Sequence, residues 1–531
     1  MTFVPFCPTI GYAETHYSFR LVPSRLRKQE PEVVADVPYR LGPGQDLPVL
    51  ILVKDAHLFP VKLTAVEVSV QSPSGEVHTA RVPWEETEIR APLWHRVIYV
   101  PRPPVVGPCR VTVAVTLNAR RVYISDNYRI SSHAPFECYF AEEPLPGTKG
   151  WHFGDLHYHS SYTSDQVEFG APLPATVAMA VAEGLSFFAV TDHSYDLDDS
   201  PNNPLRNDHG LPKWHQMRAE VAALNSSTPG CVVIPGEELS CGNSRRRNVH
   251  LLVLDNGEFL EGSGDSAERW LRTRPQQSIT HALERLDEQA LAYAAHPEDR
   301  TPFLQWLLIR RGKWSKADYL HPRLNGLQLY NGHLDPALPA ALRRWVELLL
   351  AGRRLAIVAG NDGHGNFAVF RQIGFPFFTM REQRHQLFGV ARTGVLVKGQ
   401  LSLQNIKEGL RSGRTLVTTG PFMELVAHTP SGSAHIGQTA AGSPCELTVH
   451  LQSSPEFGRL ERAVLWLGKR EAAREVQLWT CTHFPTRMTH HAKIEIPPGP
   501  GELYVRGELH TLGPQGRRSC YTSPIWFAQG D

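Results

Sequence analysis

The sequence of 531 residues has no segment that approaches the ~20 consecutive apolar residues required for a membrane helix. Its first residues also lack a charged stretch followed by a long apolar run, so we expect no secretory signal and a cytoplasmic protein. The formal net charge is only +1, from 54 basic and 53 acidic residues. This balance predicts no long-range attraction to nucleic acid or to an anionic membrane, so an anionic ligand must be held by local charge.

Cysteine is scarce as well. The eight cysteines are scattered and none forms a CxxC pair, which argues against a disulfide framework or a cysteine-based zinc site. Hydrophobic residues make up 41 % of the chain and charged residues 20 %, as is typical of globular proteins. The length predicts two to four domains of ~100–200 residues each. Nothing in the sequence indicates an oligomeric state.

Three regions differ in their hydrophobic pattern. Residues 1–148 and 415–531 contain short alternating stretches, such as Arg110–Leu117 and Glu446–Leu451, separated by turns rich in proline and glycine. Alternation with frequent turns is typical of antiparallel β-structure, so a β-sandwich is expected at each end of the chain.

The middle region, residues 149–414, alternates short apolar runs with helical stretches, which predicts either a βα barrel or a doubly wound sheet. The seven predicted strands are His152–Leu156, Ser186–Thr191, Cys231–Ile234, Val249–Leu254, Ala290–Ala295, Gly326–Tyr330 and Leu355–Gly360. The predicted helices are Ala175–Glu183, Lys213–Leu224, Ile279–Glu288 and Ala337–Leu350.

Polar side chains follow the first of these strands in the segment GDLHYHSSYTSD. His157 and His159 are two residues apart in extended chain, so both imidazoles point to one side and can reach the same ion. Asp165 follows after a short polar loop and can return to the same pocket. By itself the motif fits two surface histidines near a turn equally well.

Five further motifs place metal-ligand side chains in or after apolar runs. They contribute His193 in TDH, Glu237 and Glu238 in PGEE, His250 in NVHLL, His296 in AHP, and Asp362 with His364 in DGH. Each has an ordinary alternative, such as a helix N-cap, a solvated turn or a satisfied core histidine. In a parallel barrel, however, these strand ends would converge on one face, where active sites form.

The combined ligand set has six histidines and three carboxylates and no cysteine. Its members are His157, His159, Asp165, His193, Glu238, His250, His296, Asp362 and His364. Mixed nitrogen and oxygen ligands suit Zn, Mn or Fe. Nine ligands are too many for one ion, so we expect two or three divalent ions, which would favour an anionic, phosphate-like small-molecule substrate.

The order HxH, D, TDH, PGxE, H, HP and DxH from His157 to His364 resembles the polymerase and histidinol phosphatase (PHP) superfamily. The resemblance implies a (β/α)7 barrel with a metal cluster, often trinuclear, and mostly phosphoester hydrolysis. It assigns His157, His159, Glu238 and Asp362 to a first metal, and Asp165, His193 and His364 to a second. Glu238 would bridge to a third, together with His250 and His296.

Flanking segments narrow the resemblance to large members that include carbaryl hydrolase-like proteins, in which carbamate esters are also cleaved. These segments are GNDGHGNF with RQIG, RSGRTLVTTGPF and YTSPIWF. The expected protein is thus a PHP-type (β/α)7 barrel at residues 149–414, flanked by β-sandwich domains at 1–148 and 415–531.

The leading hypothesis for function is hydrolysis of a phosphate ester at a trinuclear site. A metal-bound hydroxide held by Glu238, His193 and Asp362 would attack, and Arg371 would bind the phosphate. One alternative is a carbamate or carboxyl ester hydrolase at the same site. Another, of a different class, is a non-catalytic binding module.

Overall fold

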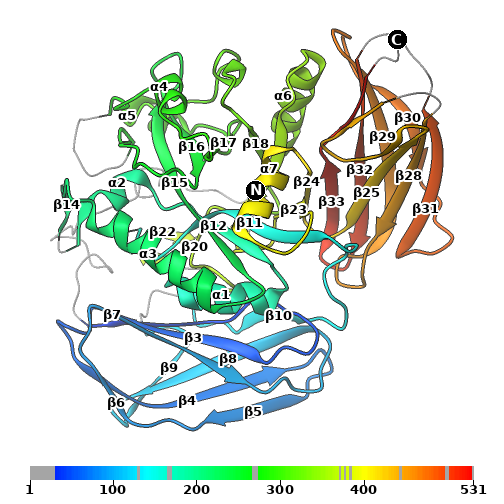
Figure 1. Ribbon diagram of the computed structural model, residues 1–531. Helices are drawn as coiled ribbons and strands as arrows, with labels where there is room; N and C mark the ends of the chain where they lie inside the picture. The colour runs from blue at the N-terminus through cyan, green and yellow to red at the C-terminus, as the bar shows by residue number, and fades with distance from the viewer. Residues whose placement is uncertain are drawn as a thin grey trace.

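The computed structural model describes residues 30–127, 132–163, 170–201, 203–265, 273–369, 372–375, 378–381, 386–441, 445–496 and 502–528. Most of the regular structure is β-strand. The strands form an N-terminal, a middle and a C-terminal group (Figure 1). The N-terminal strands lie below the middle region in this view and the C-terminal strands lie to its right.

The N-terminal region is formed by two sheets, antiparallel except for the parallel pair β2–β10. One has the order β1-β3-β7, and the other has the path β2-β10-β8-β4-β5 with β6 and β9 beside it. The bounds are β1 (Glu32–Asp36), β2 (Arg40–Leu41), β3 (Leu47–Lys54), β4 (Val61–Gln71), β5 (Val77–Val82), β6 (Thr87–Ile89), β7 (Leu93–Val100), β8 (Gly107–Leu117), β9 (Arg121–Ile124) and β10 (Phe136–Phe140). In β8 the buried residues alternate with more exposed ones, so its valines enter the core between the sheets.

All seven apolar runs predicted for the middle region are strands. They are β11 (Trp151–His159), β12 (Phe187–Val190), β15 (Val232–Gly242), β16 (Asn248–Leu254), β17 (Leu291–Ala294), β18 (Gly326–Asn331) and β19 (Ala356–Gly360). The four predicted helices are present as α1 (Leu173–Glu183), α3 (Pro212–Ser227), α4 (Ile279–Glu284) and α6 (Leu338–Leu350). Further short elements are α2 (Ser194–Leu197), β13 (Asp199–Ser200), β14 (Asn203–Asn207), α5 (Phe303–Leu308), the 3-10 turn Asp318–Leu320, β20 (Gly363–His364), β21 (Gln372–Phe375) and β22 (Phe378–Arg381).

The prediction of a (β/α)7 barrel is wrong. The strands lie in a mixed sheet in which β15–β16, β16–β17 and β11–β23 pair antiparallel. Only the short turn 243–247 separates β15 from β16, and a short connection forces an antiparallel hairpin because a parallel pair needs a crossover of a dozen or more residues. Runs that are apolar on both faces are typical of parallel strands, but burial on both faces does not set strand direction.

The same sheet continues without interruption into the C-terminal region. Its order is β19-β18-β17-β16-β15-β12-β11-β23-β24-β33-β32-β29-β30, and a separate sheet has the order β26-β25-β28-β31. The remaining bounds are β23 (Arg392–Leu396), α7 (Leu403–Arg411), β24 (Thr415–Thr418), β25 (Phe422–Thr429), β26 (Gly432–His435), β27 (Thr439–Ala440), β28 (Cys445–Gln452), β29 (Arg459–Lys469), β30 (Val476–Cys481), β31 (Thr489–Ile496), β32 (Leu503–Gly513), β33 (Gly516–Thr522) and β34 (Ile525–Phe527). The expected boundary at residue 415 therefore lies between two paired strands, β23 and β24.

Buried polar contacts join the three regions. The guanidinium of Arg40, at the N-terminal sheet, lies 2.8 Å from the carboxylate of Glu456 in the C-terminal region and donates to the carbonyl of Glu183 at the end of α1. Asp36, at the end of β1, accepts the backbone N–H groups of residues 367–369. No helix among the described residues is long and apolar enough to cross a membrane.

Candidate metal centre

Eight of the nine predicted ligands lie in one cluster, in three overlapping groups whose ligand atoms are within 4.8 Å of one another. The first group is His157, His159, Glu238 and Asp362; the second is His159, His193 and His364; the third is Glu238, His250 and His296. The ninth, Asp165, lies outside the described residues, as does Arg371. The structure therefore brings together residues that are up to 207 positions apart, from His157 to His364.

Strand β11 and its pairing with β20 place the first ligands. His157 and His159 point to the same side of β11, and β20 pairs with the end of β11 so that His159 lies opposite His364. Gly360, at the end of β19, makes this approach possible, because an added Cβ there would lie 2.4 Å from the Cβ of His157. The backbone N–H of Asp362 then donates to the carbonyl of His157.

The hairpin of β15 and β16 supplies the next ligands. Glu238 lies within β15 and not at a strand end, and it forms a parallel bridge with His193 at the start of α2. His250 lies in the partner strand β16 opposite Ser240. His296 follows β17 by two residues.

Glu238 is the centre of the cluster. Its carboxylate is only 1 % exposed, and five imidazoles face it. The nitrogen–oxygen distances are 2.6 Å to His250, 3.0 Å to His296, 3.1 Å to His193, 3.3 Å to His157 and 3.5 Å to His159. A carboxylate has about four lone-pair positions, so five imidazoles exceed its hydrogen-bonding capacity.

The pKa values show how strongly these groups are coupled. Burial raises the pKa of Glu238, but the surrounding histidines, His250 first, outweigh it and hold that pKa well below its usual value. Burial lowers the pKa of His157, but Glu238 and Asp362 outweigh it and raise the pKa to about 9. Burial lowers the pKa of His364, and neighbouring His159 lowers it further.

Divalent cations fit this donor set. Nε2 of His157 and Nε2 of His159 are 3.3 Å apart, and buried Nε2 of His364 has no hydrogen-bond partner among the described residues. Imidazole nitrogens that face one another, with carboxylates between them, are satisfied by a cation that accepts all their lone pairs. Without a cation, protons would have to supply the same positive charge in a buried site.

Two further residues hold the predicted ligands in place: Gln328, which the sequence analysis did not identify, and Asp155, for which the sequence predicts a hydrogen bond to a ligand histidine. Gln328, in β18, accepts from Nδ1 of His157 at 3.0 Å and from the backbone N–H of His296 at 3.1 Å. A glutamine in the buried strand GLQLYN was a signal for such a role. Asp155 accepts the backbone N–H of His157 and binds the side chain of Asn361, so it orients the β11 and β19 ends through the backbone and not through an imidazole.

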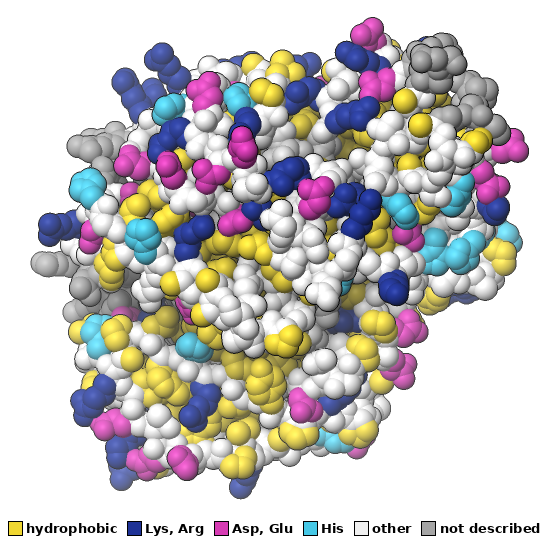
Figure 2. Space-filling view, in the orientation of Figure 1, with side chains coloured by type: hydrophobic (Ala, Val, Ile, Leu, Met, Phe, Trp, Pro, Cys, Tyr) yellow, Lys and Arg dark blue, Asp and Glu magenta, His cyan; other side chains and the backbone are white. Residues whose placement is uncertain are grey.

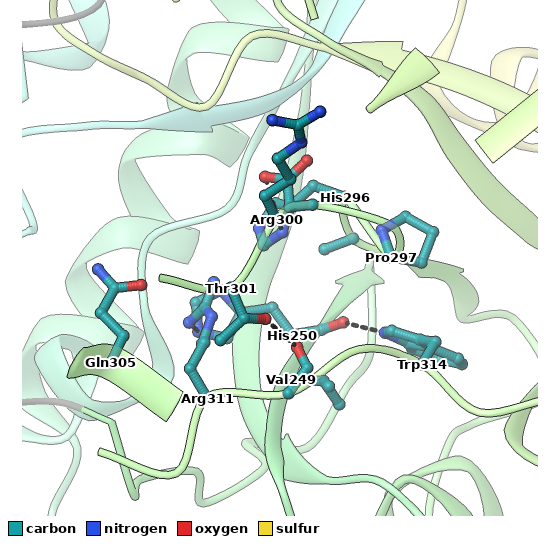
Figure 3. A pocket seen from close by; sticks show the side chains of 12 residues that line it. Val249, His250, His296, Pro297, Arg300, Thr301, Gln305, Arg311 and Trp314 are labelled. Carbon is teal, nitrogen blue, oxygen red and sulfur yellow. Dashed lines mark hydrogen bonds and ion pairs between the residues drawn. The ribbon is translucent and has the colours of Figure 1, made fainter. Parts of the chain in front are cut away.

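A small cavity of about 80 Å³ lies beside the third group (Figure 3). In this view Arg311 and His250 lie close together, and Arg300 lies farther up the wall, near His296. Nη1 of Arg311 is 2.6 Å from Nε2 of His250 and 2.6 Å from a carboxylate oxygen of Asp265, which itself lies 3.0 Å from the same imidazole nitrogen. Nδ1 of His250 therefore faces Glu238, while Nε2 faces the Asp265–Arg311 pair.

Two ligands occupy unusual backbone conformations. Asp362 has a φ of 53° and His296 a φ of 24°, in the left-handed region that non-glycine residues rarely adopt. Strain of this kind concentrates at functional sites, where the surrounding structure enforces it. Adjacent Glu237 is different: its carboxylate accepts from Ser194 and from the backbone N–H of Leu260, and it belongs to none of the three ligand groups.

Comparisons with known proteins do not identify a family. No family model matches the sequence, and no curated protein matches it. A beta-glucuronidase from Bacteroides uniformis aligns at a TM-score of 0.17 and 9 % identity, over 94 % of this chain and 61 % of that one. A beta-D-mannosidase from Dictyoglomus thermophilum aligns at 0.22 and 8 %, over 93 % and 66 %. TM-scores this low show neither a shared fold nor a shared activity.

Proposed function

We propose that this protein is a metal-dependent hydrolase whose cluster binds two or three divalent ions, Zn, Mn or Fe. The observation that supports it is the convergence of six histidines with Glu238 and Asp362 in three overlapping groups. The order of these ligands along the chain resembles the PHP superfamily, and we propose the division of ligands that this resemblance implies. When bound, such ions would activate water and neutralise anionic oxygens of the substrate.

The residues have distinct roles in this proposal. Glu238 belongs to two groups and has two carboxylate oxygens, so it would hold two neighbouring ions, whereas His159 would bind the first ion through its one free nitrogen. Gln328 orients the imidazole of His157, and Asp265 that of His250. Such outer partners fix ring orientation and set ligand basicity in metal sites.

A phosphate ester is the substrate class that we propose. Arg311 contacts the imidazole of His250, a member of the cluster. Its side chain is 23 % exposed and lines the cavity shown in Figure 3. A planar guanidinium can bind two oxygens of a phosphate at once, whereas a neutral carbamate offers no second anionic oxygen. We therefore assign to Arg311 the phosphate contact that the sequence suggested for Arg371.

Metal analysis with parallel assays tests the proposal. We expect close to three ions per chain, cleavage of an aryl phosphomonoester or phosphodiester, and competitive inhibition by inorganic phosphate. Fewer than about one ion after reconstitution with Mn or Zn would contradict the metal centre. Faster turnover of an aryl carbamate, without inhibition by phosphate, would favour a carbamate or carboxyl ester hydrolase at the same site.

Arg311→Lys separates the two ester classes. It keeps a cation beside Asp265 but removes the bidentate contact, so phosphoester cleavage should lose on the order of 2–4 kcal/mol of transition-state stabilisation if the contact is direct. Carbamate cleavage should change little. Arg343→Ala, an exposed arginine on α6, is the matched control and should leave both activities intact.

A further inference from the structure

A second cavity, of about 620 Å³, lies at the turn that joins β15 and β16. Among the residues that the structure describes, five arginines line it and no aspartate or glutamate does. They are Arg245, Arg246 and Arg247 from the turn, Arg274 from the segment before α4, and Arg310 from the segment after α5. Basic and acidic side chains are mixed over most of the face in Figure 2, so a wall of one sign departs from the general pattern of the surface.

These guanidinium groups lack acidic partners. Within the described part of the chain none of the five forms an ion pair, although the chain as a whole has 53 acidic residues for 54 basic ones. In the described segments, Arg247 alone of the five makes a side-chain hydrogen bond or ring contact: it donates to the carbonyl of Trp306 and lies 4.3 Å from the centre of that indole ring. Like charges held together without counter-charges repel one another, and an anionic ligand would relieve that repulsion.

Buried asparagines hold the arginine-bearing segments together. Asn248 is fully buried, and its side-chain amide donates to the carbonyls of Thr273 and Ile309, the neighbours of Arg274 and Arg310. Asn243 accepts the backbone N–H groups of Arg245 and Arg247 and donates to the carbonyl of Lys313. The five arginines thus come from segments that are fixed relative to one another before any ligand binds, which lowers the entropic cost of binding.

We propose that this cavity binds a small ligand with two or more adjacent phosphate groups. Several guanidinium forks around one open cavity match the many oxygens of a polyphosphate, because each fork can bind a phosphate bidentately. A single carboxylate would leave most of the five without a partner. A long nucleic acid is disfavoured because a net charge of +1 provides no long-range attraction to a polyanion.

The site is distinct from the metal centre but close to it along the chain. Arg310 lines this cavity, whereas the next residue, Arg311, lines the cavity beside His250. The turn 243–247 also joins the two strands that carry Glu238 and His250. A ligand here therefore contacts the hairpin of the metal centre without contacting its ligands.

Calorimetric titration of the full-length protein with inorganic tripolyphosphate tests the inference. The variant Arg245→Ala/Arg274→Ala removes two guanidiniums that form no hydrogen bond or ion pair with another described residue, so its fold should be retained, as circular dichroism will show. We expect its Kd for tripolyphosphate to rise at least about tenfold. Arg120→Ala, an exposed turn arginine far from the cavity in sequence, should bind as the wild type does.

The same comparison in the Glu238→Gln background separates this site from the metal centre, since the difference between the variants should persist there. Equal affinity in wild type and double variant, or no binding by the wild type, would overturn the inference. A further experiment measures binding of the protein to vesicles that contain phosphatidylglycerol. Binding to vesicles that depends on Arg245 and Arg274, with no binding of tripolyphosphate, would also overturn it and assign the arginines to a lipid surface.

Discussion

At the scale of single residues, Glu238 and Glu237 show how neighbours in the sequence acquire different roles. Both side chains are buried, 1 % and 3 % exposed. Side chains alternate along a strand, so one carboxylate faces five imidazoles and the other faces Ser194 and the backbone of Leu260. The difference lies in orientation alone, because both residues are glutamates on the same strand.

This contrast leads to a prediction for paired variants. Glu238→Gln should reduce bound metal and lower hydrolytic activity by roughly 100-fold or more, because an amide can neither bridge two ions nor balance their charge. His250→Ala should cost less, because His250 belongs to one ligand group and Glu238 to two. Glu237→Gln, which keeps an acceptor oxygen for Leu260, is the control. Metal content and kcat/KM decide the ranking, and a larger loss from His250→Ala with both variants folded would contradict the bridging role.

At the scale of elements, the proposed metal centre depends on the ends of β11, β19 and β20. Strand β19 can lie close to β11 because residue 360 is a glycine. An added Cβ there would lie 2.4–2.5 Å from atoms of His157. Real Cβ atoms do not approach that closely, so a larger residue must push the strands apart. Asp362 follows Gly360 by two residues, and its backbone N–H donates to the carbonyl of His157 at 2.8 Å.

Gly360→Ala should therefore lower both stability and metal content. Overpacking of this kind typically costs about 1–3 kcal/mol, and the shift would move Asp362 away from His157. Urea unfolding measures the first effect and elemental analysis the second. Gly210→Ala, where the nearest atom lies 3.2 Å from the added Cβ, is the comparison and should retain metal. Full metal content in Gly360→Ala would show that the strand end tolerates displacement.

At the scale of the whole molecule, the N-terminal sheets support the segment that follows the DGH motif. Asp36 is buried and accepts three backbone N–H groups, from Phe367, Ala368 and Val369, at 2.9–3.0 Å. Burial outweighs these hydrogen bonds and raises the pKa of Asp36 from 3.8 to about 7. The flanking region is thus part of the structure that positions His364, three residues before Phe367.

The raised pKa gives a prediction for stability against pH. Between about pH 4 and pH 7 the folded protein retains a proton on Asp36 that the unfolded chain releases, so this group lowers the free energy of unfolding as pH rises. The stability advantage of the wild type over Asp36→Asn should shrink across that range. Urea unfolding of both proteins at about pH 4.5 and about pH 7.5 tests it, with exposed Asp46→Asn as control. A constant difference between wild type and Asp36→Asn would contradict the shift.

Much of the local structure could be predicted from the sequence. Apolar runs of four to six residues predicted all seven strands of the middle region, and helical periodicity predicted α1, α3, α4 and α6. The ligand-type residues were also recognisable, because histidines and acids at the ends of buried runs have few structural uses. Eight of those nine lie together in the structure.

The direction of the strands was decided only by tertiary structure. Burial on both faces is the same for parallel and antiparallel strands, so the sequence pattern could not distinguish a (β/α)7 barrel from the mixed sheet that is observed. Contacts between distant segments were equally hidden. Arg311 lies 61 residues after His250 and Asp265 lies 15 after it, and nothing in the local sequence of either indicates that they meet at one imidazole. The sequence alone determined which chemical groups are available, and the packing of strands determined which of them act on one another.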